Sequence, residues 1–340
     1  MDNLPSRIEN PLGCDGADSE CFYRKATIFI GMSDLTKAIL DREYSLEMVR
    51  HFKDDTDLLN EILDYGSQLI LRATSNSPRD EKAICIIYMQ LRQVLVHLDG
   101  IAVLASAGCC FSAGLQIRSI LEIAHAMEWI LLADTDAKIR HLWVANLRKR
   151  RQWQSRGIPG TPEAALDPNA VSRLSPMAEQ LAALKDEVRG IDTFLALPEF
   201  SAINAKFQLT YAARGFDKQW YEVYAPPPDK LSIRKIADAI GKIKEYNYIY
   251  SHFSAVAHGG DLYKNVVFGQ SIFINPVRDP QDVPKLRQWA ATLVLRVYRM
   301  VLEQYLPSEI AHLDQKYVNE WRARFLKEYS INITPQDTII

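Results

Sequence analysis

One long apolar run limits what this chain can fold into. It extends from Ile101 to Leu132 and reads IAVLASAGCCFSAGLQIRSILEIAHAMEWILL. A helix that is apolar on every side belongs in a protein core or in a membrane. Its uninterrupted part has about 17 residues, which is at the short limit for a membrane span, and it lies between Asp99 and Arg118. We therefore expect a buried helix of a globular protein and no membrane partner.

The second half of this run carries ionisable residues at helical spacing. At 3.6 residues per turn, Arg118, Glu122 and His125 fall on one face of the helix. Buried charges must be paired, so this row needs partners from elsewhere in the chain. The sequence offers a second polar row at helical spacing, formed by Tyr250, Ser254 and His258. We expect the two rows to face each other across two packed helices, with Tyr250 supporting the others.

Helical patterns dominate the rest of the chain. Apolar spacing and capping residues predict helices over 45–73, 78–97, 135–153, 177–189, 232–258, 282–305 and 308–328. Asp99-Gly100 predicts a break before the central helix, residues 155–176 a long loop, and residues 265–275 a short extended excursion. Since strands and helices do not alternate, we predict an all-α multi-helix bundle. The expected organisation is an N-terminal arm over 1–40, one helical domain over 41–330 and a tail over 331–340.

Composition excludes several classes of protein. The formal net charge of −2 provides no general attraction to nucleic acid or to anionic membrane. The five cysteines have neither the spacing of a zinc site nor that of a disulfide framework, so we interpret them as reduced thiols of a cytoplasmic protein. The N-terminal sequence lacks the basic and apolar regions of a signal peptide. No cofactor is expected.

Two short motifs carry a family resemblance. The first is Arg-Ser-x-x-Glu at Arg118–Glu122, and the second is Tyr-x-x-x-Ser-x-x-x-His-Gly at Tyr250–Gly259. In this order they resemble an uncharacterised bacterial all-helical family that is distantly similar to HEPN proteins, over about residues 104–306. HEPN ribonucleases carry an Arg, four to six residues, and then a His on one helix of a usually dimeric bundle. Here six residues separate Arg118 from His125, although the residue after the arginine is Ser119 and not Asn, Asp or His.

The resemblance implies a HEPN-like bundle, a homodimer and a ribonuclease of the defence or toxin type with RNA as its partner. Metal-independent RNA cleavage needs an acid, a base and a cation on the phosphate. His125 and His258 have the chemistry for proton transfer, and Arg118 that for binding phosphate. Glu122 would hold the arginine and Ser254 would orient His258. The alternative is a non-catalytic binding or interaction module in which the same residues form a structural network.

A di-iron carboxylate enzyme is a further alternative. The sequence Glu-Ile-Ala-His occurs twice, at Glu122–His125 and at Glu309–His312. Two Glu-x-x-His helices with a glutamate from each of two other helices form a di-iron site, and the extra ligands would be Glu245 or Glu61.

A basic segment follows the central helix. It contains Arg148, Lys149, Arg150 and Arg151, with Trp143 and Trp153 on either side. Basic residues with interleaved aromatic rings can hold single-stranded nucleic acid. The alternative is a solvated helix face whose charges suit the C-terminal end of a helix.

Overall fold

The computed structural model describes residues 40–76, 81–166, 178–224, 231–257, 266–268, 272–274 and 276–327. Helices dominate these residues, which confirms the predicted all-α, multi-helix fold. The predicted N-terminal arm, apart from residue 40, and the predicted tail over 331–340 lie outside the described residues.

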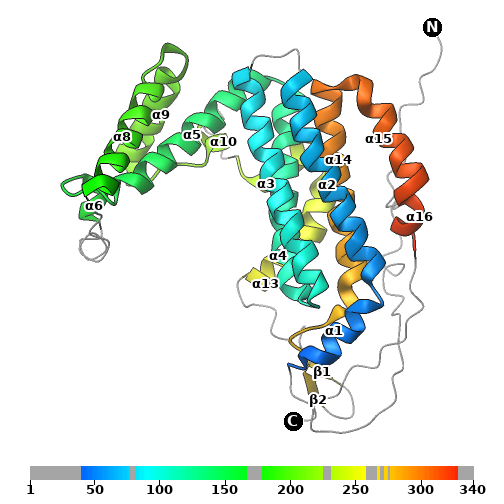
Figure 1. Ribbon diagram of the computed structural model, residues 1–340. Coiled ribbons are helices and arrows are strands. Elements are labelled where there is room, and N and C mark those ends of the chain that lie inside the picture. Colours follow the sequence, from blue (N-terminus) through cyan, green and yellow to red (C-terminus); the bar gives the residue numbers. More distant parts are fainter. Residues whose placement is uncertain are drawn as a thin grey trace.

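The central bundle is formed by α2 (Lys53–Asn76), α3 (Glu81–Ser106), α4 (Cys110–Leu132) and α14 (Val283–Tyr305) (Figure 1). On α14 the fully buried Tyr298 donates a hydrogen bond to the carbonyl oxygen of Ile62, 2.9 Å away. α2 approaches closely because Gly66 has no side chain, and a Cβ there would lie 2.1 Å from the Tyr298 hydroxyl oxygen. The long helices are thus held by apolar burial at close contact.

The apolar run belongs to two helices, so the prediction of one helix over 101–132 with a break at Asp99-Gly100 was wrong. α3 continues through Gly100 to Ser106, and α4 begins at Cys110. The chain reverses at Gly108, whose φ of +72° lies in the left-handed region that glycine adopts without strain. The run is apolar because α3 and α4 are neighbours that bury each other, and no described helix has the length and apolar character of a membrane span.

The N-terminal end of the bundle is bent where the sequence predicts one helix over 45–73. α1 (Arg42–Arg50) begins after Asp41, whose carboxylate accepts a hydrogen bond from the amide of Tyr44 (2.9 Å). The helix is interrupted at His51-Phe52 before α2 begins. Phe52 lies in this interruption and is still buried in the core. The spacing of apolar residues is therefore the same for two short helices as for one continuous helix, and it does not reveal the break.

The C-terminal helices pack beside the bundle, as the sequence predicts for 308–328. They are η4 (Pro307–Glu309), α15 (Ile310–Lys316), the π-helical η5 (Tyr317–Trp321) and α16 (Arg322–Phe325). Arg287, buried at the start of α14 just after η3 (Pro280–Asp282), pairs with Asp55 of α2 (2.6 Å). The same guanidinium donates to the carbonyl oxygen of Arg324 (2.8 Å) and so holds the end of α16 on the bundle.

A second group of helices projects from the bundle (Figure 1). We call it the arm: α5 (Thr135–Ser155), α6 (Pro162–Ala165), α8 (Ala178–Leu195) and α9 (Pro198–Arg214). The predicted loop over 155–176 contains α6, and residues 167–177 lie outside the described residues. The short α10 (Trp220–Tyr224) then packs against α5.

The predicted helix over 232–258 is divided. It consists of α11 (Ile233–Ala239), α12 (Ile243–Glu245), a π-helical turn η1 (Tyr246–Tyr250) and α13 (Ser251–Ala257). The break lies at Gly241, which has a φ of +71°. The extended excursion is confirmed by an antiparallel pair, β1 (Val266–Phe268) and β2 (Ile272–Ile274), in which Val267 lies opposite Phe273.

Candidate functional site

Arg118 lies where the two predicted polar rows meet. Its Nε donates to Glu122 Oε1 (3.1 Å), one turn further along α4. Its Nη2 donates to the hydroxyl of Tyr250 (2.7 Å), and the guanidinium carbon lies 4.3 Å from the centre of the Tyr250 ring. The Arg118 side chain is 20% exposed, and its Nη1 has no hydrogen bond with a described residue. The arginine is therefore held from two sides while its side chain remains partly exposed.

The π-helical turn stacks two tyrosines beside this arginine. The rings of Tyr246 and Tyr250 lie 4.4 Å apart and are inclined by 16°. A π-helical turn places Tyr250 differently from a regular helix, and such turns are frequent at functional sites. Burial, together with the nearby Tyr250 hydroxyl, raises the pKa of Tyr246 to about 12. We call Arg118, Glu122, Tyr246 and Tyr250 the Arg118 cluster.

His125 belongs to a different, buried network. Its side chain is fully buried, and its Nε2 lies 2.8 Å from Glu245 Oε1. Both Glu245 carboxylate oxygens accept hydrogen bonds from Arg296 of α14, at 2.7 and 2.8 Å. Arg296 also lies 3.8 Å from Glu128. We call these residues the Glu245 network.

The charges of this network are strongly coupled. Burial on its own would raise the pKa of Glu245, but the hydrogen bond with His125 and the charge of Arg296 together lower it to about 2. Arg296 was not among the predicted site residues, although a charged residue in an apolar helix signals a need for a buried partner. His125 thus faces Glu245 and not the exposed side of Arg118, because it lies deeper on α4.

The remaining predicted site residues are not brought together by the structure as it is described. Ser254 lies one turn after Tyr250 on α13, is partly buried, and has no hydrogen bond with a described residue. His258 comes directly after Ala257, the last residue of α13, and lies outside the described residues. Whether Ser254 orients His258 stays a prediction.

The basic segment is largely bound within the arm. Arg148 is buried, donates from Nε and Nη2 to the Asp217 carboxylate (3.0 and 2.9 Å), and donates from Nη1 to Asn204 (2.7 Å). Arg151 donates to Asp192 (2.6 Å) and to Glu163 (3.1 Å).

Arg150 pairs with Glu187 of α8, and Lys149 is exposed. The guanidinium of Arg148 thus binds Asp217 and Asn204 within the chain, and nucleic-acid binding by this residue stays a prediction. Arg150 and Arg151 also connect α5 with other arm segments, which leaves Lys149 as the residue of the four that faces solvent without an ion pair among the described residues.

The two Glu-x-x-His segments do not form a metal site in the described residues. Glu309 accepts a hydrogen bond from Arg72 (2.7 Å), and Glu61 accepts one from Arg324 (2.7 Å). Glu245 is bound by Arg296 in the Glu245 network. Among the described residues no group of three or more His, Cys, Asp or Glu side chains could hold a metal ion. The carboxylates of the di-iron alternative are thus occupied by arginines at separate places.

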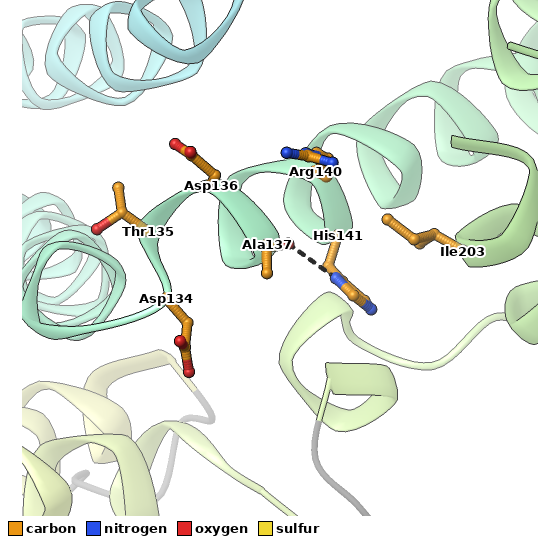
Figure 2. A pocket seen from close by; sticks show the side chains of 7 residues that line it. All are labelled: Asp134, Thr135, Asp136, Ala137, Arg140, His141 and Ile203. Carbon is orange, nitrogen blue, oxygen red and sulfur yellow. Dashed lines mark hydrogen bonds between the residues drawn. The ribbon is translucent and has the colours of Figure 1, made fainter. Parts of the chain in front are cut away.

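A hollow of about 540 Å³, which no sequence pattern predicted, lies at the start of α5 (Figure 2). Asp134 there has a φ of 52°, which is strained for a non-glycine residue, and its carboxylate accepts a hydrogen bond from Tyr224 (2.8 Å). Burial lowers the pKa of His141, whose Nδ1 lies 2.8 Å from the Ala137 carbonyl oxygen. The lining residues are Asp134, Thr135, Asp136, Ala137, Arg140, His141 and Ile203, so Arg118 does not contribute to it.

Comparison with known proteins identifies one family. Residues 85–270 match a family of unknown function, DUF5677, and this region includes both the Arg118 cluster and the arm. It covers more than half of the 340 residues of the chain. No curated protein and no solved structure matches the chain.

Proposed function

The chain belongs to the DUF5677 family of unknown function, and we propose that it is a HEPN-like protein that cleaves RNA or handles nucleotides. The observation that carries the proposal is Arg118, held from one side by Glu122 and from the other by Tyr250, with a side chain that remains 20% exposed. A planar guanidinium binds two phosphate oxygens at once, and fixing its position lowers the entropy lost on binding. Arg118 is thus the group that would bind a phosphodiester or nucleotide.

The proton-transfer role passes to His258 in this proposal. His125 is fully buried and bound to Glu245, so it has no access to a substrate hydroxyl. In the sequence His258 comes directly after Ala257, the last residue of α13, which also contains Ser254. A histidine can act as acid or base at neutral pH, and such catalysis contributes about 10²–10⁴-fold to a rate. Dimeric assembly, a cytoplasmic location and a role in phage defence are parts of the same proposal.

The test compares RNA cleavage and nucleotide binding by matched variants. Arg118→Lys keeps the charge but loses the planar fork, and His258→Ala removes the proposed acid or base. We expect at least a tenfold loss of cleavage in both, with weaker nucleotide binding in Arg118→Lys. The control is His51→Ala, which alters an exposed histidine distant in sequence from Arg118 and His258 and should keep full activity. Equal cleavage by all four proteins, or none by the wild type, would reject the ribonuclease.

A non-catalytic binding or interaction module is the second candidate. It is favoured by the Glu245 network, which shows that this chain uses buried ion pairs to join α4, α12 and α14. In that case Arg118 and Glu122 also serve to fix helix positions. Arg118→Lys would then lower the melting temperature without changing RNA cleavage or nucleotide binding.

A further inference from the structure

Glu122 has one carboxylate oxygen that the chain does not use. Its Oε1 accepts the hydrogen bond from Arg118 Nε (3.1 Å), whereas its Oε2 has no hydrogen bond with a described residue. The Glu122 side chain is 39% exposed, compared with 20% for Arg118. One oxygen therefore holds the arginine, and the other is available to a bound molecule.

A second ion pair of the same geometry lies on α14 in different surroundings. Arg299 Nε donates to Glu303 Oε1 over 3.1 Å, also at a spacing of four residues. An arginine–glutamate pair at this spacing is an ordinary feature of a helix surface. Glu122 differs because tyrosine hydroxyls surround it. Burial raises the pKa of Tyr221 and of Tyr246, and the charge of Glu122 adds to the increase in both.

The proposed ribonuclease has one proton-transfer group too few. Metal-independent cleavage needs a base for the ribose 2′-hydroxyl and an acid for the leaving oxygen. His258 can supply one of them, but His125 cannot supply the other because it is fully buried against Glu245. Arginine and tyrosine side chains carry their protons at neutral pH, whereas carboxylates carry none. Within the Arg118 cluster, Glu122 is therefore the residue that can accept a proton.

We propose that Glu122 is the general base of RNA cleavage, an inference that rests on the function proposed above. Its Oε2 removes the proton of the 2′-hydroxyl, and the 2′-oxygen bonds to the adjacent phosphorus while the bond from phosphorus to the 5′-oxygen breaks. His258 gives its proton to that 5′-oxygen, and Arg118 binds the charged phosphate oxygens. The products are a 2′,3′-cyclic phosphate and a 5′-hydroxyl, and proton exchange with water restores both residues.

The placement of the two groups suits this substrate. In RNA the 2′-hydroxyl is on the carbon next to the one that bears the phosphate, so the base and the phosphate-binding cation must be neighbours. Arg118 and Glu122 are one turn apart on α4 and in direct contact, and Tyr250 holds the guanidinium from the other side (2.7 Å). A phosphate bound by Arg118 thus brings a 2′-hydroxyl within reach of Glu122.

The test measures cleavage of a single-stranded RNA, binding of DNA of the same sequence, and the melting temperature. Glu122→Gln keeps an oxygen that can accept from Arg118 Nε but cannot remove a proton. We expect cleavage to fall at least a hundredfold, because general acid–base catalysis contributes about 10²–10⁴-fold. DNA, which has no 2′-hydroxyl, should bind equally well, and the melting temperature should not change. Glu303→Gln alters the matched pair on α14 and should cleave like the wild type.

The pH dependence separates a base from a residue that only holds its neighbour. In the wild type the cleavage rate should fall in acid as the base becomes protonated, and this fall should be absent from the residual activity of Glu122→Gln. The described titratable and charged groups that face Glu122 are Arg118, Tyr221, Tyr246 and Tyr250. Arginine and tyrosine keep their protons in acid, so none of them produces such a fall.

Different results distinguish a wrong base from a wrong function. If Glu122→Gln cleaves RNA as fast as the wild type while Arg118→Lys does not, the ribonuclease stands and Glu122 is not its base. If Glu122→Gln loses DNA binding or melting temperature together with cleavage, Glu122 serves only to hold Arg118, and the inference is wrong. A wild type that cleaves no RNA rejects both the base and the ribonuclease.

Discussion

The bundle and the arm depend on charged residues to different extents. In the bundle, the Glu245 network is a small group of charges enclosed by an extensive apolar core. In the arm, the ion pairs of Arg148, Arg150 and Arg151 join α5 to the segments around it, beside a smaller apolar contact in which Trp143 of α5 stacks on Phe194 of α8. Ion pairs therefore make up a larger part of the contacts in the arm than in the bundle.

The arm also shows why a basic run is ambiguous in a sequence. A run of arginines looks the same in a sequence whether it faces nucleic acid or the acidic residues of another helix. Here the acceptors are Asp217, Glu187 and Asp192, which come from segments far from the arginines in the sequence. A basic run predicts a nucleic-acid surface only where no such acceptors fold onto it.

The largest effect is expected when the bundle network is opened. Glu245→Ala leaves Arg296 and His125 without their buried partner, and breaking a buried pair costs about 3–5 kcal/mol. Urea unfolding should show this loss in the free energy of unfolding. The matched arm variant Glu187→Ala, whose partner Arg150 is mostly exposed, should cost less than about 1 kcal/mol. Equal losses would remove the contrast between the two regions.

A somewhat smaller and more local effect is expected in the arm. Arg148→Met removes the buried guanidinium and leaves Asp217 and Asn204 without their donor, at a cost of about 2–4 kcal/mol. Hydrogen exchange followed by mass spectrometry should show faster exchange in α9 while α14 stays protected. Faster exchange in both helices would show that arm and bundle unfold as one unit.

Acid should weaken the bundle through the same glutamate. The pKa of Glu245 is about 2 in the folded protein and about 4.5 in an unfolded chain, so its stabilisation is complete above pH 4.5. It is lost as the pH falls from 4.5 towards 2, by on the order of 2–3 kcal/mol. In Glu245→Gln this part of the pH dependence of the free energy of unfolding should disappear. An unchanged pH profile would contradict the assigned pKa.

The smallest effect concerns a carboxylate with the opposite shift. Burial and the nearby Asp282 raise the pKa of Asp279 to about 6, although the amide of Gln281 donates a hydrogen bond to it. Its folded pKa is above the unfolded value, so stability increases as the pH falls from 6 to 4. Asp279→Asn should therefore stabilise the protein at pH 8 by about 1–2 kcal/mol, and change little at pH 4. A variant destabilised at pH 8 would show that the charge itself is needed.

Helical periodicity alone predicted much of this protein. The spacing of apolar residues established the all-α fold, and the need of a buried Arg118 for a partner predicted its contact with Tyr250. Both follow from local physics, because a 3.6-residue repeat and the cost of an unpaired charge can be evaluated from nearby residues.

Only the tertiary structure decided which partner each charge received and where helices ended inside apolar sequence. His125 shares a helix face with Arg118, yet it binds Glu245 because α12 and α14 approach that level of α4. The reversal at Gly108 divides a run that is mostly apolar on both sides of the turn. Such outcomes depend on how helices are placed against one another. The Coulomb energy between two charged side chains depends on the distance between them, and for residues far apart in the sequence only the tertiary structure determines that distance.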